Sequence, residues 1–137
     1  MIKHNYIYIV DDDAITIFGI KKLLSQLSRT PKVREFGNGK TALQAITNAL
    51  KQGKQVPDFI FLDINMPIMD GWQFLEEFLK LSLDKKVTIN IVTSSIDPCD
   101  KKKWLSYRTN SKHRLLFNNK PIFSIDLEHI MRINLAS

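Results

Sequence analysis

Four short apolar runs, rich in β-branched and aromatic residues, and one alternating run that carries charge, Lys32–Phe36, recur along the chain at similar intervals. They are Tyr6–Val10, Lys32–Phe36, Phe59–Leu62, Val87–Val92 and Leu115–Phe117. Apolar runs of this length are too short for buried helices and are typical of strands, and the charged alternation of Lys32–Phe36 favours a strand at the edge of a sheet. The pattern therefore predicts five strands.

Between these runs, apolar residues recur at three- and four-residue steps, which is the spacing of amphipathic helices. We expect one helix over about 13–28, a second around Leu43–Leu50 with Gly53 as its breaker, and a third that begins at Asp70, which forms a capping box with Gln73. A fourth helix should run from Asp97 to about Tyr107. A fifth should begin at about Ser124, with Leu127, Ile130 and Met131 facing the core. Strands that alternate with helices predict a parallel sheet with helices on both faces, because parallel neighbours need crossover connections.

Polar residues follow the last apolar residue of four of the predicted strands. Asp11 and Asp12 follow the first, Asp63 the third, Thr93 the fourth and Lys120 the fifth, each within a few residues. Right-handed crossovers bring the carboxyl ends of parallel strands to one edge of the sheet, where open α/β sheets bind ligands. We therefore expect these side chains to form one site.

The acids in this set indicate a particular chemistry. Three carboxylates in one crevice repel one another unless a hard divalent cation or an ammonium group compensates them, and oxygen-only ligands indicate Mg²⁺ or Mn²⁺. A carboxylate such as Asp63 is ionised at pH 7 and is able to attack phosphorus, provided that the charge on the phosphoryl oxygens is neutralised. The metal, Lys120 and the hydroxyl of Thr93 are the predicted neutralising groups.

The motifs IVDDD, LDINMPIMDG, IVTSS and NNKP, in this order and at this spacing, resemble the receiver domain of bacterial two-component response regulators of the stand-alone type. The resemblance covers nearly the whole chain. It implies a single domain over residues 1–137, with its core at about 5–135, and a flavodoxin-like, doubly wound, five-stranded parallel sheet of order 2-1-3-4-5. It also implies a phosphoacceptor that is able to lose its phosphoryl group by hydrolysis, rather than a dedicated turnover enzyme.

The resemblance implies a role for each residue at the carboxyl edge. Asp63 is similar to the phosphorylated aspartate, Asp12 to a direct magnesium ligand, and Asp11 to a ligand that acts through water. Asn65 matches the position whose backbone carbonyl binds the metal. The phosphoryl donor implied is a sensor histidine kinase or a histidine phosphotransfer protein.

Three further positions of the family concern phosphate contact and switching. Thr93 and Lys120 match the phosphate-contacting pair, and the bond from Lys120 to Pro121 is usually cis in this family. Phe117 occupies the aromatic switch position but lacks the phenol hydroxyl of tyrosine. The segment 97–114 is long and basic for this region, so we expect an unidentified downstream protein, with an acidic surface, on a face that includes 97–107 and 115–135.

The length and the net charge of the chain limit its domain organisation, its location and the kinds of partner that it binds. A chain of 137 residues has room for one domain, so a separate output module is not expected. No apolar run approaches the roughly 20 residues that span a bilayer, and the N-terminal residues lack a signal-peptide core, so we expect no membrane partner and a cytoplasmic location. The net charge of +6 and the run Lys101–Lys103 beside Trp104 would suit nucleic acid, but such a run is more often the solvated face of a helix.

Three other function classes are alternatives to a phosphoaccepting receiver domain. A dinucleotide-binding domain needs a glycine-rich turn after the first strand, where this chain has three acids. A haloacid-dehalogenase-type phosphatase also forms an aspartyl phosphate, but its motif has a second acid where this chain has Asn65. A receiver-like scaffold that binds partners without phosphorylation remains an alternative, and phosphate uptake at Asp63 separates it from the main reading.

Overall fold

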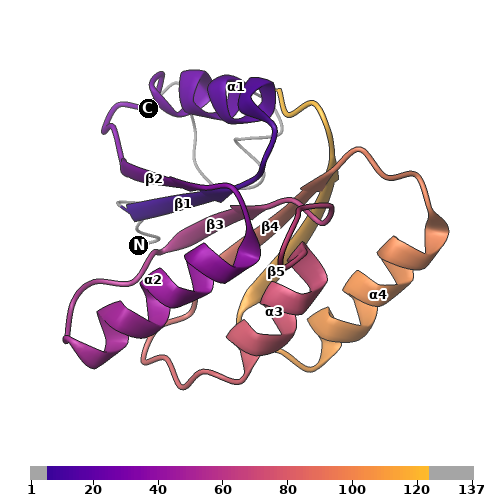
Figure 1. Ribbon diagram of the computed structural model, residues 1–137. Coiled ribbons are helices and arrows are strands. Elements are labelled where there is room, and N and C mark those ends of the chain that lie inside the picture. Colours follow the sequence, from indigo (N-terminus) through magenta and orange to yellow (C-terminus); the bar gives the residue numbers. More distant parts are fainter. Residues whose placement is uncertain (1–5, 124–137) are drawn as a thin grey trace.

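The computed structural model describes residues 6–123, which form a parallel sheet between helices (Figure 1). The elements are β1 (Tyr6–Val10), α1 (Ala14–Leu24), β2 (Lys32–Phe36), α2 (Gly39–Lys51), β3 (Phe59–Leu62), α3 (Gly71–Leu79), β4 (Thr88–Thr93), α4 (Pro98–Thr109) and β5 (Arg114–Asn119). The helix expected from about Ser124 lies outside the described residues.

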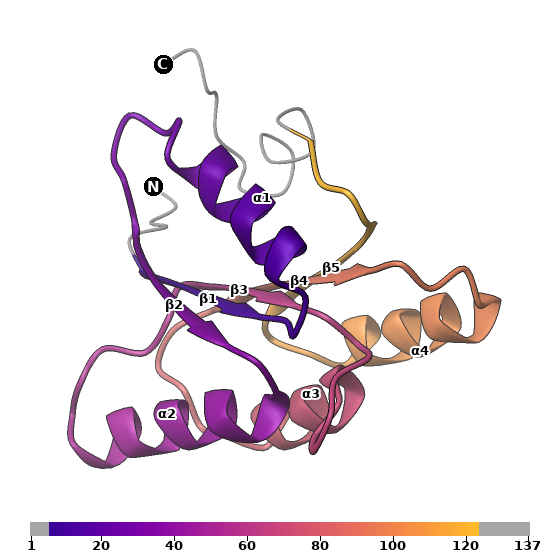
Figure 2. The same cartoon turned by 45° about the horizontal axis from the view of Figure 1, so that its top comes forward.

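The five strands form a single parallel sheet with the order β2-β1-β3-β4-β5, which confirms the predicted topology. The described helices lie in two layers. Figure 2 shows α1 on one face of the sheet, and α2, α3 and α4 on the other. Strands β2 and β5 are at the edges, as the charged pattern of β2 indicated.

Two apolar clusters hold these layers to the sheet. The larger cluster joins alternate residues of β1, β3 and β4 to the buried residues of α2 and α3, including Ile46, Phe74 and Phe78. The smaller cluster joins the opposite face of the sheet to Ile20 and Leu24 of α1. Strands β1, β3 and β4 are fully buried along their length, because parallel strands in the middle of such a sheet are covered on both faces.

The helix starts follow the predicted capping signals. Asp13, Asp70 and Asp97 are N-caps, and Asp70 forms the predicted capping box with Gln73. The sequence analysis did not identify Asn38, the N-cap of α2, which accepts a hydrogen bond from the backbone of Thr41. These caps satisfy backbone N–H groups that have no partner in the first turn of a helix.

Helix α1 is shorter than its apolar pattern predicts. It ends at Leu24 rather than Ser28, and a tighter turn follows in which the N–H groups of Gln26 and Leu27 bond to carbonyls three residues earlier. The apolar spacing also includes Phe18, but this side chain is 69% exposed and does not contribute to the core.

Gly71 sets the distance between α3 and the end of β3. A Cβ atom at this position would lie 2.2 Å from the carbonyl oxygen of Asp63, closer than any side chain is able to approach. The Gly71 N–H group also donates to the carbonyl of Ile64 at 2.8 Å. The glycine therefore brings the start of α3 directly against the peptide of Asp63.

None of the helices within residues 6–123 combines the length and the apolar character that a transmembrane span requires.

Candidate functional site

Three carboxylates meet at the carboxyl ends of β1 and β3. Asp11 and Asp63 are almost fully buried, with 2% and 5% of their surfaces exposed, and Asp12 is exposed. Ligand oxygens from the three side chains all lie within 4.8 Å of one another. Asp11 precedes the helix cap Asp13, whose N–H group donates to Asp11 Oδ1 at 2.8 Å. The local turn after β1 thus fixes one acid and leaves its neighbour, Asp12, facing solvent.

Lys120 reaches this acidic cluster from the loop after β5. Its Nζ lies 3.0 Å from Asp11 Oδ2 and 3.7 Å from Asp63 Oδ2, and its side chain is 15% exposed. Burial acts to lower the pKa of Lys120, but the hydrogen bond and charge of Asp11, together with the charge of Asp63, outweigh burial and raise the pKa. The backbone N–H of Lys120 donates to the Thr93 carbonyl at 2.9 Å, and the bond from Lys120 to Pro121 is cis.

The acids of the site carry more negative charge than Lys120 balances. Burial and, second, the charge of Asp11 raise the pKa of Asp63, and they outweigh Lys120 and the backbone N–H groups of Asn65 and Ile64, which act to lower it, so that the pKa is about 6. The pKa of Asp11 is also raised, again chiefly by burial. A hard divalent cation would relieve this repulsion, and the cluster of carboxylate oxygens fits Mg²⁺ or Mn²⁺.

Thr93 ends β4 beside this cluster and is fully buried. Its Oγ1 accepts a hydrogen bond from the backbone N–H of Ser95 at 3.0 Å. Its carbonyl accepts from the N–H of Lys120 and, at 3.4 Å, from the side-chain amide of Asn119. These bonds join the ends of β4 and β5. Asn65 lies in the loop after β3, two residues beyond Asp63, and it is exposed.

Phe117 lies on β5, next to a hollow at the same end of the sheet. Its ring is half-buried and packs against Trp104 of α4, with the ring centroids 5.8 Å apart. The hollow has a volume of about 390 Å³, and Phe117, Ser95, Lys101 and Lys120 are among the residues that line it. The Phe117 side chain therefore has open space beside it.

One polar group that the sequence analysis did not identify links this region to α3. Asp100 of α4 accepts hydrogen bonds from Trp72 Nε1 at 3.1 Å and from Ser95 Oγ at 2.6 Å. Asp100 is three residues after the helix cap Asp97, so from the sequence alone it is an ordinary acid in the first turn of a helix. Its partner Trp72 is distant in the chain, and no local pattern predicts that contact.

Comparisons with known proteins agree with this arrangement. The profile of the response regulator receiver domain family matches residues 7–111. The chain is 36% identical over 98 residues to the sensor histidine kinase CheAY of Helicobacter pylori, in a match that covers 71% of this chain and 12% of CheAY. It is 30% identical over 88 residues to the nitrate/nitrite response regulator protein NarL of Escherichia coli, covering 64% of this chain and 38% of NarL. The chain thus spans well under half the length of these relatives.

Solved structures share the fold. The phosphorylated cyanobacterial phytochrome response regulator RcpA superposes with a TM-score of 0.75 at 21% identity, over 95% of this chain and 90% of that one. The Mn²⁺-bound form of response regulator Rcp1 superposes with a TM-score of 0.71 at 18% identity, over 93% of this chain and 90% of that one.

Proposed function

The chain belongs to the response regulator receiver domain family, and from this premise we propose that Asp63 accepts a phosphoryl group and thereby changes a protein-binding surface. The observation that carries the proposal is the position of Asp63. Its buried carboxylate ends a central strand, beside two more acids and within 3.7 Å of the Lys120 ammonium group. A cluster of two buried acids and one exposed acid, with one cation, is suited to a site that receives further anionic charge together with a metal ion.

The proposed phosphoryl transfer uses Asp63 as the nucleophile. An ionised Asp63 oxygen attacks the phosphorus of a phosphohistidine on a sensor histidine kinase or a histidine phosphotransfer protein. A new O–P bond forms, the N–P bond breaks, and its electron pair returns to the departing imidazole. A carboxylate needs no general base for this step, so the protein contributes positioning and charge rather than proton abstraction.

Lys120 and Thr93 are the groups of the chain that would hold the transferred phosphoryl oxygens. The Lys120 ammonium group already faces the Asp63 carboxylate, and a charge-assisted hydrogen bond to a phosphoryl oxygen would replace this contact. The Thr93 hydroxyl is fully buried at the next strand end and has a proton to donate.

A divalent cation would be held by Asp12 and Asp63, by the backbone carbonyl of Asn65, and by Asp11 through water. When bound, Mg²⁺ or Mn²⁺ supplies positive charge that offsets the carboxylates and the phosphoryl oxygens. The oxygen-only donor set supports this assignment, because it suits hard cations better than zinc or copper.

The proposed output depends on the ends of β4 and β5. A Thr93 hydroxyl that turns toward the phosphoryl group gives up its present bond to the Ser95 N–H, and Phe117 borders open space beside that loop. We place the resulting change on α4 and β5. The complementary partner of this face is an acidic protein surface, because α4 carries Lys101, Lys102 and Lys103. The shift would select a conformation that the unphosphorylated protein already samples.

Intact-mass spectrometry after incubation with acetyl phosphate and Mg²⁺ tests the proposal. We expect a mass increase of one phosphoryl group in the wild type and none in Asp63→Asn. Asp84→Asn, which changes an exposed acid remote from the site, is the matched control and should be modified normally. An unmodified wild type at saturating donor and metal would favour a binding scaffold that needs no phosphorylation, and a modified Asp63→Asn would contradict the assignment of the nucleophile.

A further inference from the structure

A second hollow opens at the β2 edge of the sheet, remote from Asp63. It has a volume of about 640 Å³ and lies between β1, β2, the second half of α2 and the loop that follows α2. Tyr6 and Lys32 are the first residues of β1 and β2, so the hollow is at the amino ends of these strands, whereas Asp63 follows a carboxyl end. Its volume is in the range of small-molecule sites, which is about 300–1,000 Å³.

Aromatic rings from β1 hold the cations of β2 in place. The strand register pairs Tyr6 with Lys32 and Tyr8 with Arg34, so each cation and its ring are on the same face of the sheet. The Lys32 Nζ is 4.9 Å from the centroid of the Tyr6 ring, and the Arg34 guanidinium carbon is 5.9 Å from that of Tyr8 and 5.0 Å from that of Phe36. These cation–π contacts favour ordered side chains over freely moving ones.

The positive charge in the hollow is not neutralised by neighbouring acids. Within residues 6–123, Lys32, Arg34 and Lys54 line the hollow without an ion pair, and no carboxylate is among the lining residues. The acid of the same strand, Glu35, is paired with Lys21 of α1 at 2.7 Å. The alternation of β2 thus directs its acid to one face and its cations to the other, where an anion is able to bind them.

Three side-chain amides complete the polar lining. Asn48 is in the last turn of α2, Gln52 is the C-cap of this helix, and Gln55 follows in the loop. Each amide offers both donors and an acceptor, which suits the mixed edge of a nucleobase, whereas a free phosphate uses donors alone. Lysine and arginine are the usual partners of phosphate oxygens, and a guanidinium plane also stacks on flat rings.

From these features we infer that the hollow binds a small phosphorylated ligand of the nucleotide class. Lys32, Arg34 and Lys54 contact the phosphate, and the amides of Asn48, Gln52 and Gln55 contact the base. The inference does not depend on phosphorylation of Asp63, because the two sites share no residue.

Titration of the ¹⁵N-labelled full chain with AMP and with GMP, followed by amide chemical shifts, tests the inference. At least one of the two nucleotides should shift amides in residues 32–34 and 48–55, with smaller effects from adenosine or inorganic phosphate alone. Lys54→Gln and Arg34→Gln should each raise the dissociation constant by about tenfold or more, the usual effect of one lost charge-assisted hydrogen bond.

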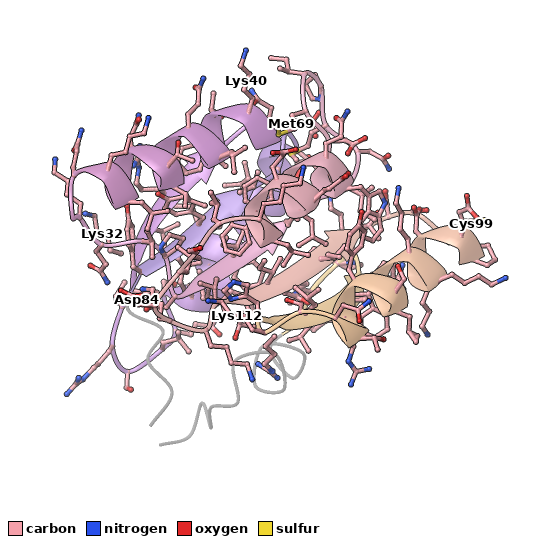
Figure 3. All side chains as sticks on the ribbon, turned by 90° about the horizontal axis from the view of Figure 1, so that it is seen from below. Lys32, Lys40, Met69, Asp84, Cys99 and Lys112 are labelled. Atoms are coloured by element: carbon pink, nitrogen blue, oxygen red, sulfur yellow. The ribbon has the colours of Figure 1, made fainter. Side chains whose placement is uncertain are left out.

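Lys40→Gln is the matched control, because it removes the same charge from the opposite end of α2. Figure 3 shows Lys32 at the sheet edge beside the end of α2 and Lys40 at the other end of this helix. Lys40→Gln should leave the dissociation constant unchanged. The inference is overturned by an absence of shifts with both nucleotides at millimolar concentration, by equal shifts with phosphate alone, or by shifts centred on Thr93 and Lys120. Equal weakening by Lys40→Gln would also overturn it, since diffuse attraction would then explain the binding.

Discussion

Trp72, in the first turn of α3, donates its indole N–H to the carboxylate of Asp100 on α4 at 3.1 Å. The other oxygen of Asp100 accepts from the Ser95 hydroxyl at 2.6 Å, and the backbone N–H of Ser95 donates to the Thr93 hydroxyl oxygen at 3.0 Å. Gly71, next to Trp72, holds the start of α3 against the peptide of Asp63. A chain of hydrogen bonds from Thr93 and a packing contact from the Asp63 peptide therefore meet at Asp100.

The first prediction is that Asp100 couples phosphorylation to α4. Asp100→Ala removes the acceptor for both side chains, so amide hydrogen exchange in residues 98–109 should be faster in the unphosphorylated protein. Beryllofluoride mimics the phosphoryl group on Asp63. The change in exchange that it causes in α4 should also be smaller in Asp100→Ala than in the wild type, because the Thr93 region and α4 are then uncoupled.

Two further variants control this experiment. Trp72→Phe keeps a ring stacked on Tyr107, where the wild-type centroids are 5.9 Å apart, but removes the N–H donor, and it should have a smaller effect in the same direction. Asp84→Ala, at an exposed acid outside α4, should leave exchange in residues 98–109 unchanged. If beryllofluoride alters α4 equally in the wild type and in Asp100→Ala, the coupling does not pass through Asp100.

A second prediction concerns the unequal roles of Asp11 and Asp12 in binding Mg²⁺. Both oxygens of Asp11 are already engaged, by the Asp13 N–H and by Lys120, whereas Asp12 has no hydrogen bond or ion pair to another described residue. Asp12→Asn should therefore raise the dissociation constant for Mg²⁺ by about tenfold or more, and Asp11→Asn by less. Calorimetric titration of the two variants and the wild type measures this, and equal constants for Asp12→Asn and the wild type would refute a direct ligand role.

The third prediction is that relief of strain at Ile68 stabilises the protein. Ile68 has a φ of 69°, a left-handed conformation that β-branched residues rarely adopt, and its side chain is 75% exposed. Asparagine tolerates this conformation better, so Ile68→Asn should increase the free energy of unfolding by about 1 kcal/mol. Urea denaturation of the variant gives this difference directly.

Ile96→Asn is a suitable comparison for this variant. Ile96 is 93% exposed, and it is absent from the positive-φ positions found within residues 6–123. The same change of side chain should alter stability there by no more than about 0.5 kcal/mol. A stabilisation of equal size at both positions would mean that lower surface hydrophobicity, and not backbone strain, is the cause.

The sequence was informative wherever a local rule decided the structure. Apolar runs that end on Asp11, Asp63 and Thr93 located both the strands and the edge where the polar groups meet, because parallel topology aligns strand ends. The N-caps Asp13 and Asp70 were equally predictable, since a cap depends on the three or four residues that follow it.

Contacts between distant segments were not predictable in this way. The bond between Trp72 and Asp100, and the cations held over Tyr6 and Tyr8, depend on which helix and strand edges pack together. Exposure of Phe18 has a similar origin, because apolar spacing marks a helix face but does not show how much of this face the sheet covers.

The last prediction concerns His113, whose buried imidazole limits stability in acid. Its Nδ1 accepts a hydrogen bond from the Val87 N–H at 3.0 Å, its ring lies 5.1 Å from that of Phe78, and its residue is 5% exposed. A protonated Nδ1 would lose this bond. Burial, together with the charges of Lys112 and Lys86, lowers the pKa of His113 from 6.5 to about 4.

Because the pKa of His113 is lower in the folded protein than in the unfolded chain, the neutral imidazole contributes stability at high pH that is lost in acid. This contribution is present in full above about pH 6.5, and it declines toward pH 4 because only the unfolded chain then takes up the proton. His113→Asn keeps an acceptor near the Nδ1 position and does not titrate, so other acid-sensitive groups, including Asp63 with its raised pKa, act equally in both proteins. The free energy of unfolding of the wild type, relative to His113→Asn, should fall by up to about 3 kcal/mol between pH 7 and pH 4. Urea denaturation at several pH values measures this difference, and a difference that stays constant with pH would show that His113 titrates normally in the folded protein.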